Sequence, residues 1–498
     1  IIFSGKSDRP VYLYIEDGKA ELHDASEYWG KSTRETVKAF KEKYGEEDLS
    51  VMTIGVAGEK LVRFAGIMNE LDRSAGRGGT GAVAGYKNLK AIVIKAAQKG
   101  NMQEPKLPDD YKKANKNAVK AILEGGLTAP RKGGLSVYGT NVLMNILNEV
   151  GGLPTKNSQL SHWDEADKTS GEYFVENLLV ANNACHACPV ACKIEVEVKD
   201  GPYKTRVESI EYESAWAFGS NCLLSDAKPI AKLVDLCNEY GYDTIELGHC
   251  FSITMEASEK GIISEKLEWG DADGMIALAQ KIAFREGIGD TLAEGPAHAA
   301  AAWGAPEISM SVKGQSIPAY DPRGVQGIGL GYATSNRGAC HVRGYTIASE
   351  IAGIPEPTDR TVPEGKGALL KIFQDLLAFS DSMDICKFSS FSENADNYAE
   401  QYSGMTGIQL TADDVMKAGE RIYNLERHYN NLAGFNKRED DFLPKRFTEE
   451  PASGNSAGMV SRMDIMLDEY YQVRGWNDGV VSEEKLAELG IVDTGVSK

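Results

Sequence analysis

The sequence predicts an α+β protein, with a β-rich N-terminal domain followed by two mostly α-helical domains. Up to residue 97, short runs of β-branched and aromatic residues alternate with helical patterns. Beyond that point, apolar residues recur with the period of amphipathic helices. The 498 residues are enough for several domains and a large buried core. We place the domains at residues 1–97, 98–345 and 346–498.

Local composition predicts the individual elements. Strands are expected at residues 1–6, 11–15, 51–56 and 91–94, with a helix at 33–44. The first of these strands is expected to pair with the second. The polar stretch 98–116, which contains two prolines, predicts a linker. Shorter helices are expected at 111–123 and 142–150, and the strongest helical patterns cover 227–240, 244–260, 273–286, 368–379 and 412–433.

Composition and charge exclude several classes of function. The formal net charge of −19 argues against a nucleic-acid backbone as a partner, and a basic or electron-carrying partner fits better. No apolar run has the length of a membrane span. Eight cysteines in so long a chain indicate a reduced, cytoplasmic setting and not a disulfide framework. The chain lacks an initiator Met and a signal-peptide pattern, so we expect it to begin inside a fold.

Three cysteines fall within eight residues. Cys185, Cys188 and Cys192 are spaced C-x2-C-x3-C, which brings three thiolates to one metal centre. A four-iron cluster needs a fourth thiolate, usually from a distant part of the chain. Cys386 is the natural candidate, and Cys340 is the alternative. A zinc site or three inert buried thiols remain possible, although no second pair of zinc ligands follows.

A glycine-rich run surrounds Arg77. Five glycines occur in the ten residues 76–85, among them Gly78 and Gly79, and such a run lets backbone amides approach a ligand closely. The Arg side chain supplies a fork that matches phosphate. The plainer interpretation is a tight turn that leads into the strand at 91–94.

Two further stretches indicate acid–base chemistry. Glu211 and Glu213 would share one face of a strand, and the apolar residues after them indicate that one carboxyl is buried and has a raised pKa. A solvated strand edge is the alternative. Residues 321–344 are rich in Gly and Arg and suit a large anionic ligand. His341 within them is a candidate proton donor, or else a structural histidine.

Residues 238–243 and 381–386 are similar to each other in sequence and form a short internal repeat. Both stretches follow an amphipathic helix and share the spacing of a polar first residue, a small or acidic fourth residue, and a polar or Cys sixth residue. The plain interpretation is two helix C-terminal turns.

Together these stretches resemble the tungsten-dependent aldehyde ferredoxin oxidoreductase family. The matching pieces run almost from end to end: 73–95, 185–192, 211–213, 238–243, 317–344, 381–386, 423–427 and 471–476. The resemblance implies one tungsten or molybdenum held by two pyranopterins and a [4Fe-4S] cluster, and it allows for Mg²⁺ bridging the pterin phosphates. Relative to the family pattern the chain lacks the first part of the sheet domain, so a partial N-terminal pterin-binding domain is expected.

The resemblance also assigns residues. Cys185, Cys188, Cys192 and Cys386 would bind the cluster. Glu213 and His341 would be the catalytic acid–base positions. Glu211 would replace Glu213 in this role if the match to the family motif were shifted by two residues. The cofactor-binding positions would be Arg77, Gly78, Gly79, Asn238, Asp243, Arg337, Asp381 and Ile385. The chain departs from the family pattern with Asn238 in place of Asp, and with Asp384-Ile385 in place of Gly-Leu.

The implied function is oxidation of aldehydes to carboxylic acids, with electrons passing through the cluster to ferredoxin or a ferredoxin-like subunit. A homo-oligomer or a larger redox complex is expected. One alternative is a low-potential catalytic subunit of the benzoyl-CoA reductase type, and another is a cluster-only electron relay. His249 and Cys250 lie near the first pterin turn, where they either pack within a helix or line a modified substrate pocket.

Overall fold

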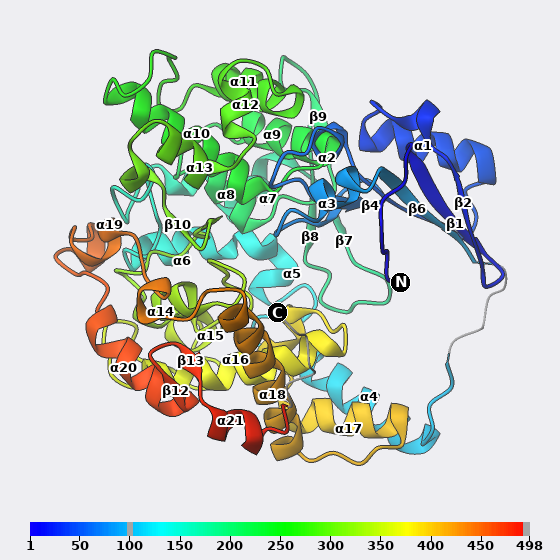
Figure 1. Ribbon diagram of the computed structural model, residues 1–498, viewed down its shortest axis with the longest axis vertical. Coiled ribbons are helices and arrows are strands. Elements are labelled where there is room, and N and C mark those ends of the chain that lie inside the picture. Colours follow the sequence, from blue (N-terminus) through cyan, green and yellow to red (C-terminus); the bar gives the residue numbers. More distant parts are fainter. Residues whose placement is uncertain (97–102, 492–498) are drawn as a thin grey trace.

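A six-stranded sheet forms the N-terminal region of the molecule (Figure 1). The computed structural model describes residues 1–96 and 103–491. The strand order is β2-β1-β6-β3-β4-β5, and β6 pairs with β1 in parallel and with β3 antiparallel. The strands are β1 (Val11–Glu16), β2 (Lys19–Asp24), β3 (Leu49–Thr53), β4 (Ile67–Asn69), β5 (Arg73–Ala75) and β6 (Leu89–Lys95).

Helix α1 (Thr33–Tyr44) covers one face of this sheet. Its N-terminus carries a capping box in which Ser32 and Glu35 exchange hydrogen bonds with each other's backbone. Val37 and Phe40 on its inner face pack against buried side chains of β1, β3 and β6. The other face is packed in part by α3 (Thr80–Tyr86). The alternation along the strands therefore places apolar side chains on both faces.

The pairing predicted for β1 is wrong. Residues 1–6 form no strand, and β1 pairs instead with β2 and β6. Asp17 and Gly18 form a two-residue hairpin between β1 and β2, with φ angles of 52° and 73°. An Asp-Gly pair favours this left-handed geometry, so the local turn decided the partner of β1. The strand expected at 51–56 ends at Thr53, and α2 (Val56–Glu59) follows.

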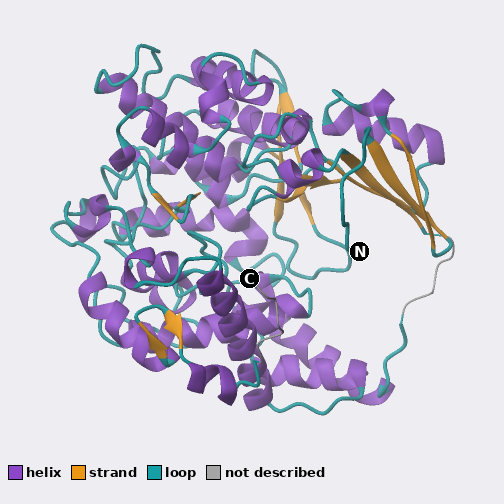
Figure 2. Cartoon of the chain, in the orientation of Figure 1, coloured by secondary structure: helices purple, strands orange, loops and turns teal. Residues whose placement is uncertain are grey.

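The remaining chain is mostly helical, so the predicted α+β class is confirmed (Figure 2). All five of the strongest helical patterns form helices within a few residues of their predicted limits. The longer helices are α4 (Pro108–Glu124), α7 (Gly171–Leu178), α9 (Ala227–Tyr240), α10 (Thr244–Glu259), α11 (Ala272–Phe284), α14 (Gln326–Thr334), α16 (Lys366–Ser382), α17 (Ala395–Thr406), α18 (Ala412–Leu432) and α20 (Met463–Arg474).

Short elements connect them. The short helices are α5 (Gly134–Tyr138), α6 (Leu143–Glu149), α8 (Tyr212–Phe218), α12 (Ile288–Leu292), α13 (Pro296–Ala302), α15 (Ile347–Glu350), α19 (Lys445–Thr448) and α21 (Glu483–Glu488). A second sheet contains β7 (Leu179–Asn183), β8 (Lys193–Val198) and β9 (Thr205–Val207). Two small hairpins pair β10 (Ser311–Val312) with β11 (Gln315–Ser316) and β12 (Trp476–Asn477) with β13 (Val480–Val481).

Helix α10 runs through the main hydrophobic core. Every residue from Ile245 to Ser258 is buried, so this helix is packed on all sides although it carries several polar residues. The one fully buried carboxylate near its C-terminal end, Glu256, is paired with Arg446 at 2.7 Å. This pairing offsets the desolvation of both charges.

The C-terminal helices assemble around buried arginines. Arg474 on α20 lies 2.6 Å from Asp375 on α16, and its guanidinium stacks over Tyr423 of α18 at 4.6 Å. Arg427 is paired with Asp441 at 2.6 Å and lies over Trp476. The stretches 423–427 and 471–476, which contribute to the family resemblance, therefore hold this region of the fold together.

The predicted domain limits are not tested by these contacts. Residue 97 and the start of the expected linker lie outside the described residues, and α4 already begins at Pro108. Helix α4 packs against α17, which was assigned to the following domain (Figure 1). In the part of the chain that the structure describes, no helix combines the length and apolar character needed to cross a membrane.

Candidate active site and thiol cluster

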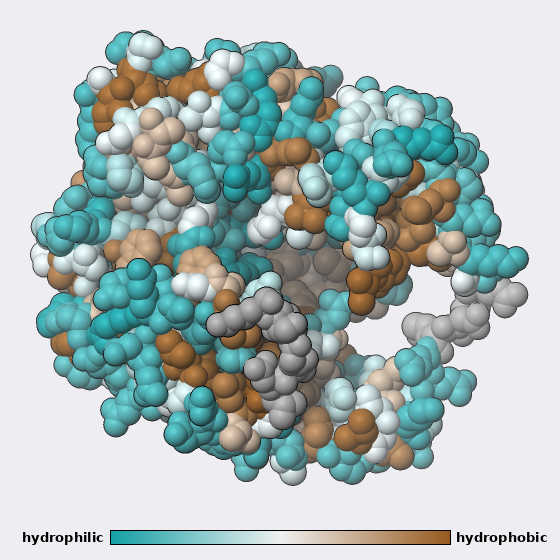
Figure 3. Space-filling model, in the orientation of Figure 1, coloured by the Kyte–Doolittle hydropathy of each residue, from teal (hydrophilic) through white to brown (hydrophobic). Residues whose placement is uncertain are grey.

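A cavity of about 670 Å³ lies where the six-stranded sheet meets the helical body. This face of the molecule is hollowed near its centre, with hydrophobic residues deep in the hollow (Figure 3). Aliphatic and aromatic side chains dominate the lining of the cavity: Leu127, Leu135, Val142, Leu143, Ile146, Ile347, Ile351, Leu377, Phe388 and Phe391. A few polar groups converge among them, which is typical of a small-molecule site.

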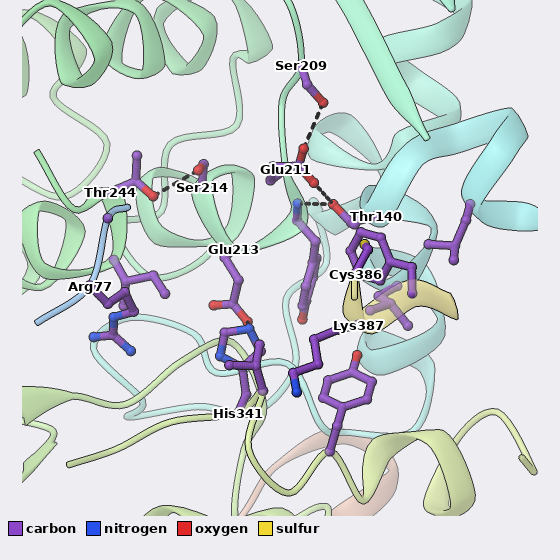
Figure 4. A pocket seen from close by; sticks show the side chains of 18 of the residues that line it. Arg77, Thr140, Ser209, Glu211, Glu213, Ser214, Thr244, His341, Cys386 and Lys387 are labelled. Carbon is purple, nitrogen blue, oxygen red and sulfur yellow. Dashed lines mark hydrogen bonds and ion pairs between the residues drawn. The ribbon is translucent and has the colours of Figure 1, made fainter. Parts of the chain in front are cut away.

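Glu213 and His341 face each other in this cavity (Figure 4). Glu213 Oε1 lies 3.5 Å from His341 Nε2. Glu213 Oε2 accepts a hydrogen bond from the backbone N–H of Ala319 at 3.0 Å. Within the described residues, Glu213 Oε1 and His341 Nδ1 are buried without a hydrogen-bond partner. Buried polar atoms are rarely left unpaired, so these two mark a place where a ligand could complete the site.

Burial shifts the pKa values of these two groups in opposite directions. It raises the pKa of Glu213 to about 8, against the opposing effects of the Ala319 N–H and the Arg77 charge. It lowers the pKa of His341 to about 3, and the charges of Arg77 and Arg337 add to this effect. At neutral pH the carboxyl therefore holds its proton and the imidazole is neutral. One group can donate a proton and the other can accept one.

The strand predicted for Glu211 and Glu213 is wrong. Glu211 is the residue before α8, and Glu213 lies in the first turn of that helix. Residues two apart on a helix do not face the same way, and the two carboxyls point to different surroundings (Figure 4). Glu211 accepts hydrogen bonds from Thr140 at 2.7 Å, Ser209 at 3.0 Å and Arg73 at 3.1 Å.

An aromatic wall stands beside His341. The rings of Tyr320 and Tyr345 lie 5.8 Å and 6.3 Å from the imidazole, centroid to centroid. Their hydroxyls are 2.8 Å apart, and Phe391 packs against the ring of Tyr345. These side chains keep the region around the acid–base pair largely apolar, which maintains the shifted pKa values.

The guanidinium of Arg77 is hydrogen-bonded to other groups of the protein. Its guanidinium donates to Asp243 and Glu246, both at 2.9 Å, and to the backbone carbonyls of Ser316 and Ala339. Asp243 also caps the N-terminus of α10. The four hydrogen bonds join the sheet region to α10 and to the segment before His341. Direct phosphate contact by Arg77 remains a prediction, and most of its donors already have partners.

Other expected cofactor positions differ in their access to the cavity. Asn238 and Asp243 line it, whereas Gly78, Gly79, Arg337, Asp381 and Ile385 are not among its lining residues. Asn238 donates its amide N–H to Asp72 at 2.9 Å, which leaves its carbonyl oxygen able to accept from a ligand. A side chain at Gly79 would collide with the Arg63 carbonyl, so this glycine is required for packing.

Residues 381–386, the second of the two similar stretches, are also held by contacts within the protein. Asp381 pairs with Lys387 at 2.5 Å and with Arg343 at 3.5 Å. Ile385 packs in a small cluster with α16 and α17. Lys387, which the sequence analysis did not single out, lines the cavity next to Cys386. Its position directly after a candidate ligand was the only signal for it in the sequence.

Cys386 joins the cysteine triplet, and Cys340 does not. Burial raises the pKa of Cys386, with the charges of Cys188 and Cys185 adding to it. Burial raises the pKa of Cys192 to about 12, and Glu211 and Cys386 contribute in the same direction. Cys188 and Cys192 pack in one apolar cluster with Phe388 and Phe391. Cys340 is buried beside Arg77, at another part of the site.

The arrangement of the thiols bears on the kind of metal centre. Across the described ranges 1–96 and 103–491, no three His, Cys, Asp or Glu side chains converge on a single-ion site. Zinc draws its ligands to about 2.3 Å from one ion. The thiolates of a four-iron cluster bind different iron atoms and lie farther apart. Whether the four thiols bind a cluster or one zinc ion stays a prediction.

His249 and Cys250 lie inside α10 and do not line the cavity. His249 Nε2 is 2.9 Å from the Ile317 carbonyl, and burial lowers its pKa to about 4. Cys250 Sγ faces the Leu292 carbonyl at 3.7 Å. The geometry supports helix packing for both residues, and not a role in a substrate pocket.

Comparison with known proteins agrees with this site. Residues 1–96 match the family described as aldehyde ferredoxin oxidoreductase, N-terminal domain, and residues 113–491 match its domains 2 and 3. A tungsten-containing aldehyde ferredoxin oxidoreductase of Pyrococcus furiosus is 42% identical over 99% of this chain and 82% of its own length. From the same organism, the WOR-like subunit of an aliphatic sulfonate oxidoreductase is 30% identical over 99% of this chain and 80% of its own.

A solved structure shares the fold. A chain of the active-site complex of benzoyl coenzyme A reductase with 1,5-dienoyl-CoA superposes with a TM-score of 0.79. It is 22% identical in sequence, and the match covers 98% of this chain and 80% of that one. The resemblance inferred from the sequence motifs is confirmed: the chain belongs to the aldehyde ferredoxin oxidoreductase family.

Proposed function

We propose that this protein oxidises aldehydes to carboxylic acids and passes the electrons through an iron–sulfur cluster to ferredoxin or a similar carrier. The observation that carries the proposal is the Glu213–His341 pair, whose opposite pKa shifts prepare a donor and an acceptor of protons in an apolar cavity. The relatives that are 42% identical along almost the whole chain are tungsten-containing aldehyde ferredoxin oxidoreductases, which supports the same reaction.

The cavity has features that fit a tungsten–pterin cofactor. Unpaired polar atoms of Glu213 and His341 face it, and the amide oxygen of Asn238 can accept from a pterin amine. Asp243 lines the same wall. A bound tungsten would supply a Lewis acid and a two-electron acceptor. A bridging Mg²⁺ is part of the proposal only by family resemblance.

The residues of the chain would manage protons and water. Conversion of an aldehyde and one water molecule to a carboxylic acid releases two electrons and two protons. The neutral imidazole of His341 would accept a proton from the incoming water, and the protonated Glu213 would donate a hydrogen bond to the aldehyde oxygen. The aromatic wall of Tyr320 and Tyr345 would limit the entry of further water.

The thiols of Cys185, Cys188, Cys192 and Cys386 would hold the cluster. Cys386 lines the cavity and is itself exposed, and the residues around Cys185 are exposed at the surface as well. A cluster at this position would therefore span the distance from the reaction site to the protein surface. That placement suits transfer of single electrons to an external carrier.

Apolar walls favour aldehydes with hydrophobic substituents. The aliphatic lining of the cavity offers contacts to alkyl and aryl groups, and the polar groups gather near Glu213. A reductase acting on an aromatic acyl thioester shares only the fold with this chain, at 22% identity. A cluster-only relay would not need an acid–base pair with unpaired atoms facing an apolar cavity.

The test combines metal analysis with activity. Anaerobically purified protein should contain tungsten or molybdenum with about four irons per chain, and should reduce a viologen with hydrophobic aldehydes. Glu213→Gln should keep its metals and lose turnover, whereas Glu176→Gln, at an exposed position on α7, should behave as wild type. Iron without tungsten or molybdenum would support the relay instead. Full activity of Glu213→Gln would contradict the assigned acid–base role.

A further inference from the structure

We propose that the exposed segment 179–187 is the docking surface for a small acidic electron-carrier protein, and that Arg131 and Lys132 form a basic rim that orients this partner. The segment consists of β7 and the turn that contains Cys185, and we call it the docking strip. The inference rests on the proposed function, because it concerns the place where electrons leave the protein.

The docking strip leads directly to the thiols. Strand β7 ends at Asn183, two residues before Cys185. The backbone N–H of Cys188 donates to the Cys185 carbonyl at 3.0 Å, so the chain turns sharply here. Cys185 is exposed, and the side chains of Leu179 and Val180 are 37% and 41% exposed. A partner seated on the strip would therefore contact both the apolar strand and the turn that bears the thiols.

The docking strip is uncharged. Residues 177–192 contain no Asp, Glu, Lys or Arg, although these types make up 26% of the chain. Along the chain, the nearest carboxylate is that of Glu176, at the end of the strip that lies away from Cys185. The central part of a protein–protein interface is poor in charged residues. On a chain of net charge −19, an exposed stretch without charge fits a contact surface.

The strand within the strip has a free edge. Strand β7 is the outer strand of the sheet β7-β8-β9 and pairs with β8 along one side. Proteins commonly protect such edges with charged residues or proline, and β7 contains neither. Its outer edge therefore offers main-chain groups as well as apolar side chains to a partner.

Two cations stand beside the strip. Arg131 and Lys132 lie in the loop between α4 and α5, and both are exposed. Asn182 of β7 donates to the Ser136 carbonyl at 3.2 Å, and Ser136 Oγ accepts from the backbone N–H of Arg131 at 2.8 Å. These contacts bring the loop and α5 next to β7 (Figure 1). Within residues 103–491, neither cation forms an ion pair.

The sign of these charges indicates an acidic partner. An acidic carrier is repelled by most of a chain of net charge −19. Two unpaired cations beside an uncharged strip favour its approach from this side, since complementary charges steer encounter and fix orientation. Arg131 adopts a φ of 58°, a conformation that glycine takes more easily. The loop therefore keeps a charged side chain at a position where glycine would fit with less strain.

The electron count separates docking from catalysis. Oxidation of one aldehyde releases two electrons, and two oxidised carrier molecules that take one electron each complete the turnover. A viologen also takes single electrons, but it is a small ion and needs no docking surface. The rate with viologen therefore measures the reaction site, whereas binding and reduction of a protein carrier measure the strip.

The test uses a bacterial two-cluster ferredoxin of net negative charge as the probe. The double variant Arg131→Glu/Lys132→Glu is compared with Lys112→Glu/Lys113→Glu, which changes the net charge by the same amount at two exposed cations near the other end of α4. We expect the first variant to raise the KM for ferredoxin and its Kd, measured by calorimetry on the metal-loaded protein, about tenfold or more. Val180→Glu, which places a negative charge on the strip, should do the same. Rates with viologen should match wild type in all variants.

The outcomes separate this inference from the proposed function. Wild-type KM and Kd for ferredoxin in both strip variants would overturn the inference, and so would an equal effect of the Lys112/Lys113 control. If the Arg131/Lys132 variant loses its viologen rate, Val180→Glu decides by the same two constants. A wild-type oligomer that dissociates in Val180→Glu would assign the strip to a second copy of the chain and also overturn the inference. A wild type that reduces viologen but not ferredoxin would contradict the inference alone, whereas no aldehyde oxidation with either acceptor would overturn the proposed function with it.

Discussion

The pH dependence of turnover is the most direct consequence of the Glu213 environment. With a pKa of about 8, this carboxyl is protonated in about 90% of molecules at pH 7 and in about 10% at pH 9. If the protonated form is required, kcat/KM should fall about tenfold for each pH unit above 8. His341, with a pKa of about 3, stays neutral over the same range and adds no second limb.

The assay is the rate of aldehyde oxidation with excess viologen between pH 6 and 10. The wild type and the exposed control Glu176→Gln should show the same alkaline limb. Glu213→Gln should lose about two to four orders of magnitude in kcat/KM, and its residual rate should lack the limb. A wild-type profile that is flat to pH 9 would refute the reasoning. So would a limb that survives in Glu213→Gln, because another group would then be titrating.

Three further predictions concern stability and metal content. Unfolding lets the buried carboxyl of Glu213 ionise, so the free energy of unfolding of the wild type should fall relative to that of Glu213→Gln as pH rises from about 4.5 to 8, by at most about 5 kcal/mol. Thermal denaturation of metal-free protein measures this, and parallel curves would contradict it. Cys386→Ala should lose cluster iron and Cys340→Ala should keep it, as iron analysis would show; the reverse result would exchange their roles. Arg474→Met should lower the free energy of unfolding because Asp375 loses its buried partner and keeps only Lys371 at 2.7 Å; the loss should stay below the about 3–5 kcal/mol of a fully unpaired buried charge, and a wild-type midpoint of unfolding would disprove this.

The sequence predicted the helices well because their signals are local. The amphipathic periods of α9, α11, α16 and α18 appear directly in the chain, and so does the buried helix α10. The strand partners of β1 were harder to predict from the sequence. It depends on the Asp17–Gly18 hairpin and on β6, which lies more than 70 residues farther along the chain. Strand partners that are distant in sequence leave little trace in local composition.

The site residues also divide into those that local sequence predicts and those whose partners are distant in the chain. The cysteine spacing predicts the triplet, and the similar stretch around Cys386 predicts its distant partner; their common role as cluster ligands stays a prediction. The alternation of Glu211 and Glu213 gave the wrong secondary structure, because two acidic residues two positions apart also occur where a helix begins. Arg77 matched a phosphate-binding pattern, yet its partners Asp243 and Glu246 come from a helix more than 160 residues away. Such pairings require the tertiary fold.

The four-way contact of Arg77 also determines how the molecule responds to salt. Besides apolar packing of residues such as Phe64 in the main core, the sheet region meets the helical body through arginine–carboxylate pairs, including Arg34–Asp235 at 2.7 Å and Arg63–Glu294 at 2.6 Å. Mobile ions screen the exposed Arg63–Glu294 pair strongly and the buried Arg77–Asp243 pair much less. Rising ionic strength should therefore loosen the rim of this junction before its centre. The Arg77 pairs should therefore persist at salt concentrations that already weaken the exposed Arg63–Glu294 pair.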